Sequence, residues 1–217
     1  MKKSLILVCL LALVAVAAQA QLSSNTMMKI ITRNVTPGID PHSFGAKPKI
    51  LYRMGEKYGR SEELPDPGMK LHLLVVVSEP NVWMINLWDK TGKLIIDPGP
   101  TYVFRASIIP SEERGMKPPL EDFEFGTEYD FLRSNKAVQT RTIVQGKKYD
   151  CLRVTREGYD ITLLSHIGTK TPYRVRVKRG ERIVCEYEYD AYQKGLSPKI
   201  KLFKPPSDVK IIETVKP

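Results

Sequence analysis

The chain has 217 residues and a formal net charge of +10, with 34 Lys and Arg against 24 Asp and Glu. This length suits one domain, and the absence of any run of five basic residues excludes a polybasic tail. The composition therefore indicates a solvated basic surface, which could attract anionic lipid, acidic polysaccharide or nucleic acid.

The chain opens with the features of a bacterial secretory signal peptide. Two lysines precede an apolar run over residues 5–18, and a small-residue cleavage site follows, which ends at Ala20. Cleavage there discards Cys9 and removes two lysines, so the net charge falls to +8. Neither this run nor any later one is long enough for a comfortable membrane span. We therefore expect a periplasmic or secreted protein without a transmembrane segment, for which nucleic acid is the least available partner.

Residues 21–49 are polar and interrupted by prolines. We expect an irregular N-terminal segment here, with one short strand or helical turn over 27–31. Residues 50–60 alternate loosely between apolar and polar side chains, which predicts a strand. From there to residue 217 we expect a single β domain.

Residues 71–104 predict three or four strands separated by turns. Pro80 cannot donate a hydrogen bond to a central ladder. Residues 90–93 are predicted to form a hairpin loop in which Gly92 takes a positive φ, and residues 97–100 to form a rigid turn.

The strand over 82–88 is apolar on both faces, and such a strand must be covered on both. We expect the wholly apolar face to pack in the core, and the second face to meet a helix, a sheet or a bound apolar ligand. The first face carries Trp83, Ile85 and Leu87, and the second carries Val82, Met84 and Trp88.

Residues 123–138 contain the best helix candidate. Thr127 is its expected N-cap, and Glu128 and Asp130 would lie in the first turn, where carboxylates suit the helix dipole. The side chains expected to face inward are Tyr129, Phe131 and Leu132.

The remaining chain alternates short strands with turns, which predicts an antiparallel meander. The strands are expected over 140–144, 149–155, 159–165, 173–178 and 183–189. In the last hairpin, pairing of the apolar faces would bring outer basic and acidic side chains together. The inner residues would be Tyr173, Val175, Val177, Ile183, Cys185, Tyr187 and Tyr189, and the outer ones Arg174, Arg176, Lys178, Glu186, Glu188 and Asp190.

Three fragments carry a family resemblance: Gly146-Lys-Lys-Tyr-Asp-Cys-Leu-Arg-Val154, Thr171-Pro172-Tyr173 and Phe203-x-Pro-Pro-x-x-Val209. With the leader and the meander, they make residues 50–213 resemble the periplasmic lipoprotein-carrier (LolA-like) superfamily. The resemblance implies a mainly β fold, in which an antiparallel meander forms an incomplete (open) barrel with one or more short helices. Members hold acyl chains or other apolar ligands in that space. The carriers begin with a long amphipathic helix, which residues 21–49 lack, so no functional residue is carried over.

The candidate ligand-binding residues are Met54, Met84, Asn86 and Trp88. The methionines and the tryptophan are able to touch an apolar ligand, and the amide of Asn86 could orient a head group. Their alternative role is ordinary core packing. The histidines are dispersed, and no nucleophile elbow or phosphate-cradling glycine loop occurs, so we expect no catalytic residue, no metal and no cofactor.

Two cysteines remain after cleavage, Cys151 and Cys185, and both are expected on inner faces. They either form a disulfide, which requires a strongly curled sheet, or serve as small buried hydrophobic residues.

On this resemblance, the first hypothesis is a non-enzymatic envelope protein that binds a lipid, a lipoprotein acyl chain or another apolar ligand. The second is a structural or adaptor protein of the cell envelope that binds a protein partner and has no cavity. A hydrolase with an unrecognised site ranks third. A cavity inside the open barrel favours the first hypothesis, and a filled core with an exposed apolar edge favours the second.

Overall fold

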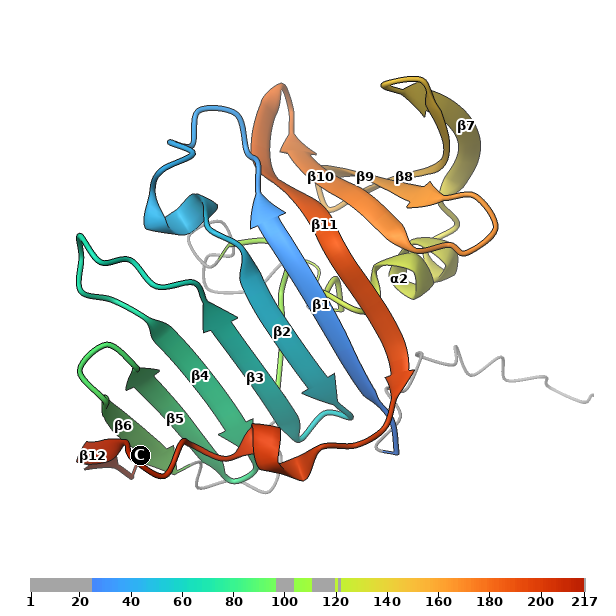
Figure 1. Ribbon diagram of the computed structural model, residues 1–217. Helices are drawn as coiled ribbons and strands as arrows, with labels where there is room; N and C mark the ends of the chain where they lie inside the picture. The colour runs from blue at the N-terminus through green and yellow to red at the C-terminus, as the bar shows by residue number, and fades with distance from the viewer. Residues whose placement is uncertain (1–24, 97–103, 111–119, 121, 217) are drawn as a thin grey trace, which may run out of the picture.

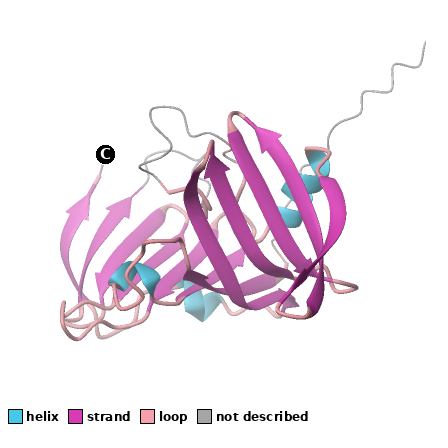
Figure 2. Ribbon diagram, turned by 90° about the horizontal axis from the view of Figure 1, so that it is seen from above, coloured by secondary structure: helices cyan, strands magenta, loops and turns pink. Residues whose placement is uncertain are grey.

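The computed structural model describes residues 25–96, 104–110, 120 and 122–216. They form one strongly curved sheet of twelve strands, which does not close into a barrel (Figures 1 and 2). The predicted mainly β fold, an open antiparallel meander with a short helix, is confirmed. The predicted leader and the turn over 97–100 lie outside the described residues.

The strands are joined in the order β12-β6-β5-β4-β3-β2-β1-β11-β10-β9-β8-β7, and all neighbours are antiparallel except β12 and β6. Along the chain the elements are β1 (Met27–Asn34), η1 (Phe44–Ala46), β2 (Lys49–Met54), β3 (Tyr58–Glu63), β4 (Leu73–Ser78), β5 (Asn81–Asn86), β6 (Thr91–Ile96), α2 (Glu128–Ser134), β7 (Val138–Val144), β8 (Lys147–Arg156), β9 (Tyr159–His166), β10 (Pro172–Arg179), β11 (Arg182–Leu196), η2 (Ile200–Phe203) and β12 (Lys210–Val215).

Local turn chemistry sets the β7–β8 and β8–β9 hairpins where the sequence predicts them. Gln145 and Gly146 have φ of 49° and 76°, and Glu157 and Gly158 have φ of 54° and 80°. Two successive residues with positive φ are the requirement of a type I′ turn, whose twist matches that of the flanking strands.

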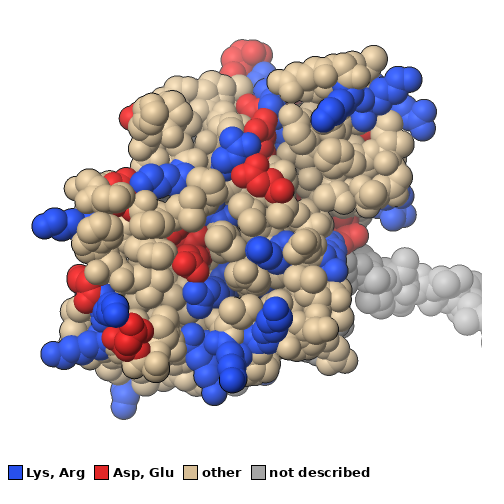
Figure 3. Space-filling model, viewed as in Figure 1, with Lys and Arg blue, Asp and Glu red and all other residues tan. Residues whose placement is uncertain are grey.

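The predicted pairing of β10 with β11 is confirmed from Arg174 to Val177, after which a register shift places Ile183 opposite Lys178. Val175 lies opposite Tyr187, and Val177 lies opposite Cys185, on the inner face. On the outer face Arg174 pairs with Glu188, and Arg176 Nη2 lies 2.8 Å from Glu186 Oε1. The interleaved positive and negative side chains are visible over the centre of Figure 3.

The N-terminal segment is more ordered than its sequence indicates. Residues 27–34 form β1, which lies inside the sheet between β11 and β2. Its partner β11 is far away in the chain, so local composition gives no sign of this pairing. Residues 50–60, expected to form one strand, form β2 and β3 around Gly55, whose φ is 59°.

Gly92 does not occupy the turn in which the sequence places it. It lies in β6 opposite Ile85, and the positive φ of this hairpin belongs to Lys90. Asp89 holds the turn, because its Oδ1 accepts hydrogen bonds from the backbone N and the Oγ1 of Thr91. A Cβ on Gly92 would lie 2.9 Å from Ile85 Cγ1, so close strand packing explains the glycine.

Different parts of the chain cover the two faces of the sheet. Residues 104–110, 120 and 122–137, here named the covering segment, include α2 and pack on the concave face, behind the sheet in Figure 1. The C-terminal segment after β11 crosses the convex outer face, where Phe203 packs against Met27 and Met54. Within the described residues, no helix has the length and apolar character to cross a membrane.

Gly59→Ala should destabilise the protein, because the new Cβ would lie 2.6 Å from three ring atoms of Phe104 in the covering segment. Overpacking of this kind costs about 1–3 kcal/mol. Gly45→Ala is the matched control, since its Cβ would meet only Ile39 Cδ1 at 3.6 Å. Chemical denaturation measures both changes, and equal free energies of unfolding for the two variants would contradict the close approach of Phe104.

Candidate functional site

With respect to the residues that the structure describes, the concave face of the sheet has a covered part and an uncovered part. The covering segment buries the concave face of β8 to β11 and of the adjoining β1 and β2. Its side chains and those of the strands form one apolar cluster, which includes Ile30, Leu51, Leu152, Ile161, Leu163, Val175, Val177, Ile108, Ile109, Phe123, Phe131 and Leu132. This half of the sheet is therefore ordinary protein core.

A buried carboxylate ties α2 to β11. Glu128 is fully buried and accepts hydrogen bonds from Tyr189 Oη at 2.7 Å, Tyr192 Oη at 3.0 Å and the backbone N of Gly126 at 2.8 Å. Burial raises the pKa of Glu128 above its ordinary value, and the three hydrogen bonds oppose that rise. The tyrosine pKa values are raised too, first by burial and then by the carboxylate.

A second buried charge ties the covering segment to β2. Arg53 is 2% exposed, and its Nη1 lies 2.5 Å from Glu124 Oε2. Arg53 Nη2 also donates to the backbone oxygen of Phe104 at 3.0 Å, and Arg105 Nη1 lies 2.6 Å from the other oxygen of Glu124. Buried ions require such complete pairing, because an unpaired partner would keep the full cost of desolvation.

The uncovered part of the concave face lies over β4, β5 and β6. Val77 on this face still packs in the main cluster, and Val75 and Val82 lie against its margin. Met84, opposite Val75, is 44% exposed. The outer face of β5 is different, since Ile85 is 0% exposed beneath the C-terminal segment. An apolar strip therefore continues from the core toward the open side of the sheet.

The structure does not bring the four predicted ligand-binding residues together. Met84 lies on the uncovered concave strip. Met54 lies on the outer face, where it is buried with Met27 and Phe203. Trp88 is 46% exposed and lies in the turn between β5 and β6.

The side chain of Asn86 is occupied by backbone groups. Its Oδ1 accepts from the backbone N of His72 at 2.9 Å and of Trp88 at 3.1 Å, and its Nδ2 donates to the carbonyl of Lys70 at 3.2 Å. These contacts hold two chain connections at the same end of β4 and β5. They leave little capacity for a ligand head group.

The two cysteines are buried and do not form a disulfide. Cys185 lies on the inner face, where its Sγ donates to the carbonyl of Ile108 at 3.6 Å. Cys151 lies in register with Leu164 and Arg174, which places it on the outer face, contrary to the sequence-based expectation. The opposite faces follow from alternation along β8, because Leu152 takes the inner position.

Sequence reasoning missed the buried charges. The sequence pattern predicts Glu128 to be a helix-dipole residue, whereas it faces the core and binds two tyrosines. Arg53 could have been noticed, because it follows Leu51 by two residues and so shares the apolar face of β2. Within the described ranges, no group of three or more His, Cys, Asp or Glu side chains could hold a metal ion.

The solved structures that align with most of this chain have low sequence identity to it. An uncharacterized conserved protein from Thermus thermophilus has a TM-score of 0.48 and 10% identity, over 87% of this chain and 91% of that chain. A domain described as an outer membrane lipoprotein-sorting protein, from Vibrio parahaemolyticus, has a TM-score of 0.36 and 10% identity, over 84% and 90%. A LolA superfamily protein from Nitrosomonas europaea has a TM-score of 0.33 and 10% identity, over 87% and 94%.

No family model matches the sequence, and no curated protein does. The solved structures thus include a LolA superfamily protein, and all three TM-scores lie below 0.5.

Glu128→Gln should change how stability depends on pH. Because burial raises the folded-state pKa above 4.5, the native protein holds this proton to higher pH than the unfolded chain does. The stability that protonation contributes is complete below the unfolded pKa and is lost as pH rises through the folded pKa. Glutamine does not titrate, so the wild-type advantage should shrink as the pH rises from about 4 upward.

Chemical denaturation across this pH range measures the difference in unfolding free energy. Glu181→Gln is the control, because Glu181 is fully exposed. A difference between wild type and Glu128→Gln that stayed constant with pH would show that Glu128 titrates alike in both states.

Proposed function

We propose that the protein is a non-enzymatic envelope protein that binds a lipid or another apolar ligand on the uncovered concave face of β4 to β6. The observation that carries this proposal is the contrast between neighbours on β5. Ile85 is wholly buried on the outer face, whereas Met84 is 44% exposed on the concave face.

The shape of the site supports an elongated apolar ligand. Val75 and Val82 pack against the main apolar cluster, and Met84 lies opposite Val75, so a ligand chain would contact the core margin at one end and leave the sheet at the other. Methionine suits such a surface, because its unbranched thioether adapts to different ligand shapes. Lys93 lies opposite Met84 on β6, and its Nζ lies 2.5 Å from Glu213 Oε2 on β12. This ion pair forms the polar margin of the strip.

The leader-like residues 1–20 support export, and a periplasmic or secreted location is part of the proposal. N-terminal sequencing of the mature protein tests this part. A chain beginning at residue 21 is expected, and one beginning at Met1 would contradict export by cleavage.

A second candidate is an adaptor that binds a protein partner through strand addition. It is favoured by β7, the last strand of the sheet, on which Val138 is 66% exposed and Ile143 is 65% exposed. An edge strand offers unpaired backbone groups to an extended peptide, and exposed apolar side chains add to the affinity.

Met84→Asp should abolish binding of a fluorescent fatty acid and leave the fold intact, since a carboxylate on the apolar strip must be desolvated beneath the ligand. Ile143→Asp is the matched control, because it makes the same kind of change at an exposed site on β7. It should leave fatty-acid binding unchanged, and it would weaken binding of a partner strand. Ile85→Ala, in contrast, should cost about 2–5 kcal/mol of stability.

Native mass spectrometry of protein purified from its own envelope complements the titration, and co-purified lipid is the expected result. Unchanged fatty-acid affinity in folded Met84→Asp would reject the concave strip as the site. Loss of partner binding in Ile143→Asp alone would favour the adaptor.

A further inference from the structure

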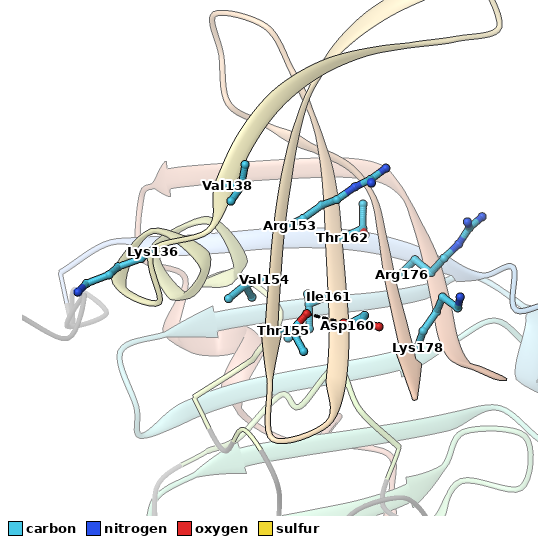
Figure 4. A pocket seen from close by; sticks show the side chains of 10 residues that line it. All are labelled: Lys136, Val138, Arg153, Val154, Thr155, Asp160, Ile161, Thr162, Arg176 and Lys178. Carbon is cyan, nitrogen blue, oxygen red and sulfur yellow. Dashed lines mark hydrogen bonds between the residues drawn. The ribbon is translucent and has the colours of Figure 1, made fainter. Parts of the chain in front are cut away.

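A basic groove lies on the outer face of the sheet, close to the β7 edge. Figure 4 shows it between β7 and β10, where side chains from four strands and the end of the covering segment enclose about 730 Å³. The residues that matter here are Val138, Arg153, Thr155, Thr162, Arg176 and Lys178. The groove is thus built on the face opposite the concave strip, and it does not depend on the proposed function.

The strand register places the cations around a hydroxyl group. Arg153, Thr162 and Arg176 are direct cross-strand partners on β8, β9 and β10. Because neighbouring strands are about 4.8 Å apart, the two arginines flank Thr162 with their Cα atoms about 10 Å apart. Lys178 follows Arg176 by two residues on the same face, and Figure 4 shows the three cationic side chains projecting to the same side of the sheet.

The carboxylates near the groove each have a partner among the described residues, and only Glu186 is neutralised by an arginine. Arg176 Nη2 lies 2.8 Å from Glu186 Oε1. Asp160 Oδ1 accepts a hydrogen bond from Thr155 Oγ1 at 2.5 Å. Lys178 Nζ lies 3.5 Å from Glu181 Oε2, and the Glu181 side chain is fully exposed. Arg153 has no carboxylate partner among the residues that the structure describes. Figure 3 shows several Lys and Arg side chains at the upper right of this view, with surface of other residues between them.

From this arrangement we infer that the groove binds the phosphate group of a small phosphorylated molecule. The guanidinium fork of Arg153 matches phosphate oxygens in a bidentate manner, and Lys178 adds a point charge. Arg153 and Lys178 add positive charge beside the paired Arg176 and Glu186, against the single lining carboxylate of Asp160, which suits an anionic phosphate group. The volume exceeds that of phosphate alone and falls among those of small-molecule sites, so the rest of the molecule would lie against Val138 and the threonines.

Calorimetric titration with inorganic phosphate and inorganic pyrophosphate at near-physiological salt tests the inference. Wild type should bind pyrophosphate, and Arg153→Gln should weaken that binding about tenfold, because one charge-assisted contact is lost. Thr162→Val, which removes the hydroxyl and keeps the shape, should weaken it less. Lys210→Gln is the matched control, since it removes one exposed positive charge from β12 at the opposite edge of the sheet.

Two sources could supply the phosphate, and vesicles distinguish them. Binding to phosphatidylcholine vesicles that contain phosphatidic acid, with displacement by pyrophosphate, would assign the groove to a lipid head group. Pyrophosphate binding without vesicle binding would assign it to a soluble molecule, and both outcomes support the site. Failure of wild type to bind phosphate, pyrophosphate or these vesicles would overturn it. So would equal weakening by Arg153→Gln and Lys210→Gln, because only net charge would then matter.

Discussion

β1 is paired along both of its edges, and this pairing joins two half-sheets into one. On one side β1 meets β2, the first strand of the run that ends at β6, and on the other it meets the long strand β11. Its side chains also serve both faces, because Met28 and Ile30 enter the concave core and Met27 packs beneath η2. The curvature that forms the concave face therefore depends on a strand from the N-terminal end of the described chain.

Two buried charge clusters hold the covering segment on that concave face. Arg53 with Glu124 and Glu128 with its two tyrosines combine hydrogen bonding with the cost of desolvation, so they specify where the segment docks more than they add stability. They lie on β2 and β11, on either side of β1. The covering segment is thus held across the junction of the half-sheets. On the concave face of β5, Met84 is exposed.

The two faces of the sheet offer chemically different surfaces. The concave strip is apolar and continuous with the core, and the outer groove near β7 is basic and lined by hydroxyl groups. A ligand with an apolar part and an anionic part would not bridge them, because the sheet itself lies between. The two proposals can therefore succeed or fail separately.

The sequence by itself determined what depends on near neighbours in the chain. Positive-φ pairs set the β7–β8 and β8–β9 turns, and strict alternation set the register of β10 against β11, including the ion pairs of Arg174 and Arg176. The position of α2 and its inner residues Phe131 and Leu132 also followed from local pattern, whereas the burial of Glu128 did not.

Tertiary structure decided the rest. The C-terminal segment covers the outer face of β5, so Ile85 is buried on that face. Pairing with β11 places β1 inside the sheet. Because Leu152 takes the inner position on β8, Cys151 lies on the outer face. The sequence predicted that the amide of Asn86 could orient a ligand head group. In the structure this amide makes hydrogen bonds with three backbone groups, those of Lys70, His72 and Trp88. The burial of β5 and the pairing of β1 depend on segments far apart in sequence, and periodicity along one strand carries no record of what will pack against it.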